Sequence, residues 1–418
     1  MKKVDCCNLK TMLIIGASVF AGISGLAAAA DLGTATIGDL KIETKVYGFL
    51  NAQIESVKAD GGATPYDSRG RVSDGNSRLG FSGAIPVNAT TKAVWQLEGG
   101  LNNFENGGVN DQGSSATLES RNSFVGIDDT RFGRLIAGNN DSAYRSLVGS
   151  GGLLGGNLGL TVNGLDVFNN TTAQMTGNAN SIFSRGESRM KNSVHYFSPD
   201  FKGLQLAGSY GFDEAQSSGS NRERYSLAAK YSYSGFQLGL GYDRQANTGV
   251  LVDNIAKGTG FSTGAVNNVN TSFYKAVASY TFPTKTYLGV GVERGSYGYN
   301  SHNAEGSMKQ DGWMISAAQD LRDDVSVKVA YARLGGLSNA LTGSSDDYGA
   351  RQFAIGAQYN FNRYIATYVY YTEIRNEALQ SVDLGQAPIY SNNAGTSSAY
   401  LAPGDSPRAL GVGLIARF

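Results

Sequence analysis

Hydrophobic and polar positions alternate along most of this chain with a period of two residues. Between Tyr225 and Tyr233, large apolar or aromatic residues occupy most odd positions, whereas serine, alanine and lysine occupy the even ones. The segment 353–361 repeats the pattern with glutamine, glycine and alanine between its large residues. A period of two is typical of a β-strand with two different faces. Because the second face is rich in Gly, Ser, Lys and Gln, we expect it to line a wet interior.

Sixteen segments of this kind follow one another, and their connections alternate between short and long. Short connections such as 128–130 and 283–284 separate connections that run from 8 to nearly 50 residues. Short turns at one rim and long loops at the other are typical of an outer-membrane barrel. The pattern therefore predicts an all-β fold, a 16-stranded antiparallel transmembrane β-barrel. The expected strands are 45–57, 77–87, 90–102, 118–127, 131–139, 188–198, 203–213, 222–233, 235–246, 271–282, 285–297, 310–319, 325–334, 350–361, 364–375 and 407–418.

Tyrosine and phenylalanine concentrate at the ends of the expected strands, often beside the short turns. Amphipathic rings favour the boundary between hydrocarbon and headgroups, so we predict aromatic girdles at both rims. The ordinary β-propensity of aromatic residues is the alternative explanation. The aromatic-rich segments are 196–197, 210–212, 231–236, 280–282, 359–364 and 368–371. The Gly-, Asn- and Ser-rich segments 58–76, 103–117, 247–270 and 376–406 are predicted to be surface loops.

The first 30 residues have the pattern of a secretory signal peptide. Three lysines precede or flank the start of an apolar run at 12–20, and small residues follow as far as Ala30. A membrane anchor is the alternative, but glycines interrupt the apolar stretch and it ends in small residues. Both cysteines precede the apolar run. We therefore expect a signal peptide at 1–30, cleaved near its end, and a barrel domain at 31–418.

Composition and charge narrow the class of protein further. The chain has 56 Gly, 23 Tyr and 18 Phe, and charged residues make up only 17% of it. Lys and Arg number 35, as do Asp and Glu, which disfavours a globally basic nucleic-acid binder. Without residues 1–30 the charge becomes about −2. Past residue 30, no apolar run approaches the roughly 18 to 20 residues of a spanning helix, which excludes a helical membrane protein.

Four motifs of the sequence resemble the Gram-negative general porins. They are SRLGFSG at 77–83, WQLE at 95–98, SRNSFVGI at 120–127 and NSVHYFSP at 192–199. With the signal peptide and the terminal Phe418, the resemblance covers essentially the whole chain in the right order. It implies a homotrimer of 16-stranded barrels in the outer membrane, in contact with lipid and lipopolysaccharide, through which small hydrophilic solutes and ions diffuse passively. It also implies that the outer-membrane assembly machinery recognises Phe418.

The resemblance further implies a constriction loop, folded into the lumen, after the fifth strand at about 140–187. This segment lacks the acidic Pro-Glu-Phe-Gly type motif of the enterobacterial pattern, which puts an acidic constriction wall in doubt. Asp166 is its only acidic residue far from both ends. We expect Asp166 to be the acidic residue of the constriction loop.

Opposite that loop, the family places a wall of basic side chains. By motif match, Arg78, Arg121 and Lys191 fall on this wall, and Arg189 lies two residues before Lys191 on the same face. All four have the parity opposite to the large apolar residues of their strands. They should point into water, because a charge facing lipid near the midplane costs about 2–4 kcal/mol.

The inward charges of the expected strands are nine basic and five acidic. The basic residues are Arg78, Lys92, Arg121, Arg189, Lys191, Lys230, Lys275, Lys328 and Arg417; the acidic residues are Glu55, Glu98, Glu119, Asp243 and Glu293. An excess of one sign raises the local concentration of the opposite ion, so the sequence favours a weak anion preference. Loop charges at the mouth could reverse it. For Lys92, Lys230, Lys275 and Lys328 we expect an ordinary inward position without a special role.

The chain offers little for catalysis or for a cofactor. It has only His195 and His302, with no paired metal-ligand spacing, so we expect no metal, no cofactor and no enzyme activity. His195 has the same inward parity as Ser193, but no nucleophile-elbow motif accompanies the pair. The glycine-rich segment 149–159 lacks the Gly-Lys-Ser/Thr ending of a phosphate-binding loop.

A passive diffusion channel is therefore the leading function, and two alternatives stand beside it. One is a solute-specific porin, for which the inward Tyr47 and Phe49 would form a sugar slide; they lie at one rim and do not recur, which favours packing. The other is a plugged barrel that acts as an adhesin or receptor. A plug needs a substantial extra domain, and the roughly 14 residues at 31–44 are too few.

Overall fold

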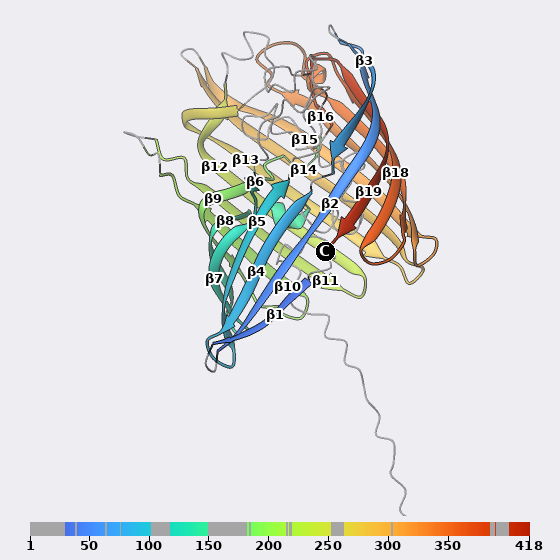
Figure 1. Cartoon of the computed structure of the whole chain (residues 1–418). Coiled ribbons are helices and arrows are strands. Elements are labelled where there is room, and N and C mark those ends of the chain that lie inside the picture. Colours follow the sequence, from blue (N-terminus) through green and yellow to red (C-terminus); the bar gives the residue numbers. More distant parts are fainter. Residues whose placement is uncertain are drawn as a thin grey trace, which may run out of the picture.

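The protein forms one closed antiparallel barrel. The computed structural model describes residues 30–37, 40–62, 65–75, 77–101, 118–148, 182–183, 185–214, 216, 220–251, 263–301, 304–384, 389 and 401–418, with side chains from Glu43 onward except at 118–120, 263, 301 and 304. Short turns gather at one rim of the barrel, and the longer connections gather at the other (Figure 1). No helix in these residues is long and apolar enough to cross a membrane.

The strands follow one another around the wall. In chain order they are β1 (Ala30–Ile37), β2 (Leu40–Asp60), β3 (Tyr66–Asp74), β4 (Arg78–Pro86), β5 (Thr91–Leu101), β6 (Leu118–Ser120), β7 (Ser123–Asp129), β8 (Gly133–Asp141), β9 (Arg189–Phe197), β10 (Leu204–Gly211), β11 (Arg224–Tyr233), β12 (Phe236–Val250), β13 (Thr263–Thr281), β14 (Thr286–Ser301), β15 (Ala304–Asp320), β16 (Val325–Ser338), β17 (Ala350–Asn360), β18 (Ile365–Asn376) and β19 (Ser406–Arg417). Within the described residues, two short 3-10 helices, η1 (Arg145–Leu147) and η3 (Ser345–Tyr348), lie between them.

These segments make up a wall of sixteen strands, as the sequence predicts. β3 and β4 pair with consecutive stretches of β2, so together they form one interrupted strand. β6 and β7 pair in the same way with β5 and form another. β1 pairs with the first residues of β2. The remaining strands, β8 to β19, each pair with their neighbours in the chain, and each forms one complete strand of the wall.

The two ends of the wall meet between β19 and β2. Their pairing runs from Ser406 opposite Asp60 to Arg417 opposite Phe49. Beyond it, the Gly48 N–H donates to the Phe418 carbonyl at 3.0 Å, and the Phe418 N–H donates to the Gly48 carbonyl at 3.1 Å. The terminal residue therefore forms part of the seam that closes the barrel.

Several strands extend further toward the long-loop rim than the alternation predicts. The predicted loop 58–76 contains β3, and the predicted loop 247–270 shortens because β12 and β13 continue to Val250 and Thr263. β15 begins at Ala304 and not at residue 310. These extensions carry polar residues on both faces. Because both faces can contact water there, the sequence loses its period of two although the backbone pairing of the strands continues.

The two faces of the wall have opposite chemistry. On the outer face, apolar side chains such as Ile54 and Val125 are 71% and 65% exposed, whereas Glu98 on the inner face is 3% exposed. Aromatic pairs lie on the outer face near the turns, including Tyr280 with Phe282 at a centroid distance of 4.7 Å. This arrangement fits a lipid-facing belt with an aromatic girdle.

Two tyrosines assigned from sequence to the girdle lie elsewhere. Tyr368 and Tyr370 are buried on the inner face, where the Tyr368 hydroxyl donates to Asn51 Oδ1 at 2.7 Å and the Tyr370 hydroxyl donates to Glu55. Each ring crosses a glycine of the neighbouring strand, since Gly413 is paired with Tyr368 and Gly411 with Tyr370. Consecutive residues of a strand point to opposite faces, so the members of an aromatic-rich segment cannot all be assigned to the rim together.

Candidate functional site

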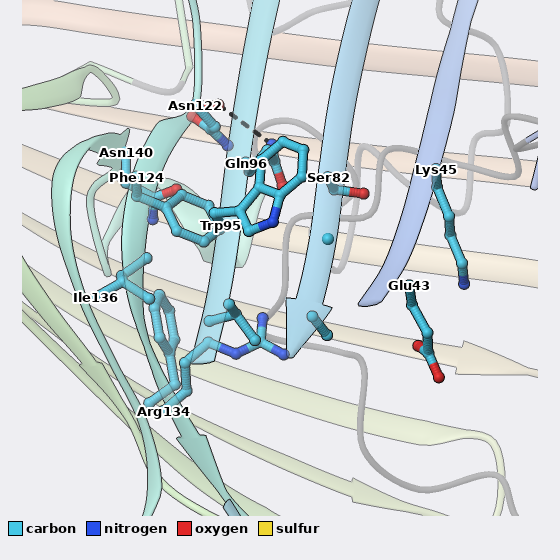
Figure 2. Close-up of a pocket in the computed structure, with 14 residues that line it drawn as sticks. Glu43, Lys45, Ser82, Trp95, Gln96, Asn122, Phe124, Arg134, Ile136 and Asn140 are labelled. Atoms are coloured by element: carbon cyan, nitrogen blue, oxygen red, sulfur yellow. Dashed lines mark hydrogen bonds between the residues drawn. The ribbon is translucent and has the colours of Figure 1, made fainter. Parts of the chain in front are cut away.

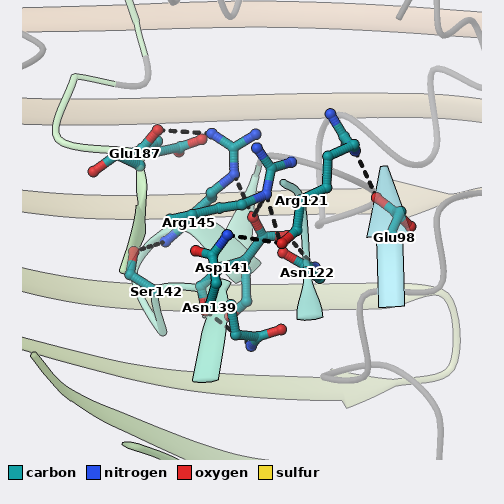
Figure 3. Close-up of polar contacts among 12 residues, drawn as sticks. Glu98, Arg121, Asn122, Asn139, Asp141, Ser142, Arg145 and Glu187 are labelled. Carbon is teal, nitrogen blue, oxygen red and sulfur yellow. Dashed lines mark hydrogen bonds and ion pairs between the residues drawn. The ribbon is translucent and has the colours of Figure 1, made fainter. Parts of the chain in front are cut away.

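A cluster of charged side chains lies on the inner wall where the connection between β8 and β9 begins. We call it the central basic cluster, and Figure 3 shows most of it. It comprises Arg78, Glu98, Arg121, Asn122, Asp141, Arg145 and Arg189. Its members come from β4, β5, the break between β6 and β7, the end of β8, η1 and the start of β9. Alternation turns Arg78 and Glu98 inward, and the strand break turns Arg121 and Asn122 toward the same point.

Ion pairs link the cluster in two halves. In the first half, Arg121 Nε donates to Glu98 Oε1 at 2.6 Å, and Arg78 Nη1 lies 4.0 Å from the same oxygen. The Arg78 guanidinium also lies 4.7 Å from the centre of the Phe49 ring, a cation–π contact. The Tyr47 hydroxyl donates to Glu98 Oε2 at 3.0 Å. Tyr47 and Phe49 thus pack beneath the charged groups and do not form a separate aromatic track.

The second half surrounds Asp141. Arg145 Nε donates to Asp141 Oδ1 at 2.7 Å, and Arg189 Nε lies 3.3 Å from the same oxygen. Asn122 joins the groups because its amide nitrogen donates to Asp141 Oδ2 at 3.0 Å and its amide oxygen accepts from Arg189 Nε at 3.0 Å. These bonds fix the direction of both guanidinium groups.

The cluster carries more positive than negative charge. It contains four guanidinium groups and two carboxylates, a surplus of two charges. Two buried donors of the cluster, Arg78 Nε and Arg189 Nη2, have no hydrogen-bond partner among the described residues. Buried donors are normally paired, so each of these two atoms retains an unused capacity to donate a hydrogen bond.

The structure brings together three of the four residues expected on the basic wall. Arg78, Arg121 and Arg189 are in the cluster, but Lys191 is not. The ladder between β8 and β9 shifts register beside Lys191, and Asn192 has a φ of 47°. Met190 and Ser193 are both buried, whereas Lys191 and Asn192 are exposed. This β-bulge removes Lys191 from the inward row, so its predicted orientation is wrong.

The connection between β8 and β9 is held against the inner wall at both ends. At its start, the Ala143 N–H donates to Ser209 Oγ at 3.0 Å and the Tyr144 N–H donates to Ser226 Oγ at 2.8 Å. Gly241 of β12 lies directly beneath, because a Cβ there would lie 2.8 Å from Leu147. Both described ends therefore run along the inner wall, where the sequence predicts a constriction loop. Asp166 and residues 149–181 lie outside the described residues.

The far end of the connection is fixed by a second cluster, which we call the loop anchor. It comprises Tyr144, Arg185, Glu187, Lys275 and Glu293. Arg185 is fully buried, and its Nε donates to Glu293 Oε1 at 2.9 Å. Glu293 also accepts from the Tyr144 hydroxyl at 3.2 Å and lies 3.3 Å from Lys275 Nζ, which pairs with Glu187 as well.

Further bonds satisfy the buried guanidinium group of Arg185. It donates to the Tyr297 hydroxyl at 3.1 Å and to the Gln310 carbonyl at 2.9 Å. Burial alone would lower the pKa of Arg185, but Tyr297 and Glu293 raise that pKa above its ordinary value. The group therefore stays charged and attaches the loop to β14 and β15.

A cavity of about 220 Å³ adjoins the central basic cluster on the side of the short turns (Figure 2). Asn122 and Asn140 form its boundary with the cluster, and Glu43, Lys45 and Arg134 add charges along its walls. Gln96 spans part of the wall, because its amide nitrogen donates to the Asn122 carbonyl at 3.3 Å. The cluster thus borders a cavity whose walls are partly polar and partly apolar.

His195 is used in holding the wall and the loop together. Its Nε2 contacts Ser193 Oγ at 2.8 Å, and its Nδ1 contacts Ser209 Oγ at 2.7 Å, the serine that also binds Ala143. In the described part of the chain, neither hydrogen-bond partner of His195 is a carboxylate. A Ser-His hydrolase needs a third group to orient its histidine, so the contacts favour a packing role. His302 lies outside the described residues.

Sequence reasoning missed most of the loop anchor and Arg145. Lys275 was expected to be an ordinary wall charge, yet it bridges Glu187 and Glu293. One signal was available, since Lys275 and Glu293 are directly opposite each other in the β13–β14 ladder. Arg145 follows Asp141 by four residues, but without a regular helix that spacing predicts no pair. The contact of Arg185 joins positions 108 residues apart and leaves no local pattern.

A closed sixteen-stranded barrel whose inner wall carries fixed charges and whose outer face is apolar defines an outer-membrane β-barrel channel. Comparison with known proteins agrees with this class. A model of the Gram-negative porin family matches residues 16–379. The chain belongs to the Gram-negative porin family, and it is an outer-membrane porin through which small hydrophilic solutes and ions diffuse passively.

Relatives and solved structures add detail. The major outer membrane protein P.IB of Neisseria gonorrhoeae is 25% identical over 343 residues, covering 77% of this chain and 85% of that protein. The P.IB protein of Neisseria lactamica is 24% identical over 336 residues, with the same coverage.

Among solved structures, an anion-selective porin from Comamonas acidovorans superimposes with a TM-score of 0.66 at 19% identity, covering 90% of this chain and 100% of that one. OmpF of Salmonella typhi superimposes with a TM-score of 0.56 at 17% identity, covering 89% and 97%. These two structures support the fold.

Proposed function

We propose that this porin has a weak preference for anions, set by the central basic cluster. The observation that carries the proposal is the surplus of two positive charges among inward side chains, together with the unpaired donors Arg78 Nε and Arg189 Nη2. Fixed charge of one sign in a narrow lumen raises the local concentration of the opposite ion. The similarity in fold to an anion-selective porin is consistent with this proposal.

Other inward charges are either neutralised by partners or lie away from the cluster. Lys275 faces two carboxylates, and Arg224 Nη2 lies 2.8 Å from Asp243 Oδ2. Lys230 and Lys328 also face inward and are buried, but they lie toward the short turns. Selectivity therefore depends on the cluster more than on the total count of charges.

The test is the reversal potential of single channels in a KCl gradient. Wild-type channels should show a chloride-to-potassium permeability ratio above one. The double substitution Arg78→Ser and Arg121→Ser should bring the ratio close to one, because the cluster then carries two guanidinium groups and two carboxylates. The matched control is Lys230→Ser with Lys328→Ser, which removes the same inward charge away from the cluster and should shift the ratio less. Clear cation preference in the wild-type channel would overturn the proposal.

We further infer that the porin is a homotrimer with an N-terminal signal peptide at 1–30. A trimer form of OmpT from Vibrio cholerae has the same fold, with a TM-score of 0.59 at 15% identity, and supports the inference. Phe418, at the closing seam, would be recognised by the outer-membrane assembly machinery. The protein acts as a channel and not as an enzyme, and needs no cofactor. Mass measurement of the secreted, detergent-solubilised protein tests both the cleavage and the subunit number.

A further inference from the structure

Three arginines lie side by side on the outer face of the barrel near the long-loop rim. Arg333 of β16 is directly opposite Arg351 of β17, and Arg351 is directly opposite Arg375 of β18. All three are exposed. Side chains directly opposite each other on antiparallel strands have Cβ atoms about 4.5–5.5 Å apart, and like charges in such positions repel. We call this row the arginine ladder.

Among the described residues, an ion pair compensates only one of these charges. Arg375 Nε lies 2.8 Å from Glu373 Oε1. In the described part of the chain, no carboxylate lies within ion-pair distance of Arg333 or Arg351. Asp347 of the nearby loop is bound elsewhere, because its Oδ2 accepts from the Ser344 N–H at 2.7 Å. A row of like charges at this spacing is destabilising unless a partner of opposite charge covers it.

The surroundings of the ladder indicate what kind of partner fits. Below it, the same outward rows continue with Tyr331, Phe353 and Ile355, and the latter two are 38% and 46% exposed. Trp313 is paired with Arg333 and packs on Tyr331 at a centroid distance of 5.5 Å. Tryptophan and tyrosine are enriched at the level of lipid headgroups, so the ladder lies at the boundary between headgroups and hydrocarbon.

We propose that Arg333, Arg351 and Arg375 bind the phosphate groups of a multiply acylated, bisphosphorylated glycolipid in the outer leaflet, whose acyl chains lie along Tyr331, Phe353 and Ile355. Arginine is suited to this because its planar fork binds phosphate through two hydrogen bonds. The bound molecule must be amphipathic, because the row of arginines directly adjoins the apolar belt. More than one phosphate is required because three adjacent guanidinium groups extend across three strands.

The proposal deepens the expected contact with lipopolysaccharide by naming its site. It does not depend on ion preference, because the ladder faces away from the lumen. Binding and channel selectivity can therefore succeed or fail separately.

The chain provides its own reporter for the test. It has 2 tryptophans, and Trp313 lies beside the ladder, whereas Trp95 is on β5. In a Trp95→Phe background, Trp313 fluorescence of the folded protein in non-ionic detergent is followed during titration with diphosphoryl lipid A. Monophosphoryl lipid A and phosphatidylglycerol are titrated in parallel. We expect diphosphoryl lipid A to bind the most tightly, and added salt to weaken its binding.

The ladder variant is Arg333→Gln, Arg351→Gln and Arg375→Gln in one chain. Each arginine near an anionic lipid surface contributes about 1 kcal/mol, so loss of three should weaken binding roughly 100-fold. The matched control is Arg131→Gln, Arg322→Gln and Arg363→Gln, an equal charge change at the short-turn rim, which should bind as wild type. Because arginine ladders repel in the absence of lipid, the ladder variant should fold at least as well as wild type, and its single-channel conductance verifies folding.

Specific outcomes overturn the proposal. If the ladder variant binds diphosphoryl lipid A as tightly as the wild type, the ladder is not the site. If the control variant loses as much affinity as the ladder variant, the loss is an effect of net charge and not of the ladder. Monophosphoryl lipid A or phosphatidylglycerol binding as tightly as diphosphoryl lipid A would remove the requirement for two phosphates. Dissociation of lipid-free oligomers in the ladder variant would assign the row to contact with a second copy of the chain. Arg→Lys at all three positions, which keeps charge but loses the fork, should give intermediate affinity.

Discussion

At the scale of single residues, the inner wall pairs glycine with tyrosine. Gly413 and Gly411 of β19 lie under the rings of Tyr368 and Tyr370, and Gly80 of β4 lies under the ring of Tyr47. The hydroxyl groups of these tyrosines then reach polar partners on the next strand, such as Asn51 for Tyr368. Each of these tyrosine rings needs a glycine beneath it, and this pairing accounts for part of the abundance of both residue types.

This pairing predicts the effect of adding a side chain at Gly413. A Cβ there would occupy the position of the Tyr368 ring, so Gly413→Val should displace the ring and break its hydrogen bond to Asn51. Overpacking of this kind typically costs about 1–3 kcal/mol. The free energy of unfolding in guanidinium, measured for the protein in lipid vesicles, tests the expectation.

Gly208→Ala provides the comparison for that experiment. A Cβ at Gly208 would meet only Leu227, at an ordinary distance of 3.6 Å. We expect its unfolding free energy to stay close to that of the wild type. Equal stability of Gly413→Val and Gly208→Ala would show that the tyrosine rings do not depend on the glycines beneath them.

At the scale of elements, the connection between β8 and β9 depends on a few buried ionic contacts. Glu293 accepts from the Arg185 backbone N–H at 3.1 Å, from its Nε at 2.9 Å and from the Tyr144 hydroxyl at 3.2 Å. One carboxylate therefore holds both ends of the loop against β14. Removal of one partner from a buried ion pair leaves the other charge uncompensated, which typically costs about 3–5 kcal/mol.

We predict that Glu293→Ala releases the loop from the wall without opening the barrel. Arg185 and Lys275 would lose a carboxylate, and Tyr144 would lose its acceptor. Single-channel recordings should then show larger fluctuations of the open current than the wild-type protein. Asp311→Asn is the control, because the exposed pair of Arg294 with Asp311 is on the outer face and contributes little to stability. An open current as quiet in Glu293→Ala as in Asp311→Asn would contradict the anchoring role.

The elements also show where sequence reasoning succeeds and where it ends. Inside the hydrocarbon belt, one face must be apolar, so alternation identifies the sixteen strands and the inward direction of Arg78 and Glu98. Beyond the belt both faces contact water, so β3 and the parts of β12 to β15 near the long-loop rim show no alternation of apolar and polar residues. The bulge at Lys191 reverses parity without a signal in composition. Arg185 finds Glu293 through the closed fold, which local spacing does not encode.

At the scale of the whole molecule, charge is sorted by position. The outer face carries an apolar belt and, at one rim, the arginine ladder; the inner face carries the central basic cluster and the loop anchor. A formal net charge of +0 for the chain hides this arrangement. A water-filled lumen with fixed charges, inside a closed barrel, accounts for passive diffusion because ions and small solutes cross without a conformational step.

The most direct test of the channel function is the current through a planar lipid bilayer after addition of the purified protein. An open aqueous channel should give discrete, stable conductance steps, linear in voltage at low potential, whose size grows in proportion to the conductivity of the salt solution. Neutral sugars small enough to enter should reduce that conductance in order of size without blocking it. Insertion of folded protein that leaves the bilayer electrically silent would contradict the central claim that the barrel encloses an open aqueous channel.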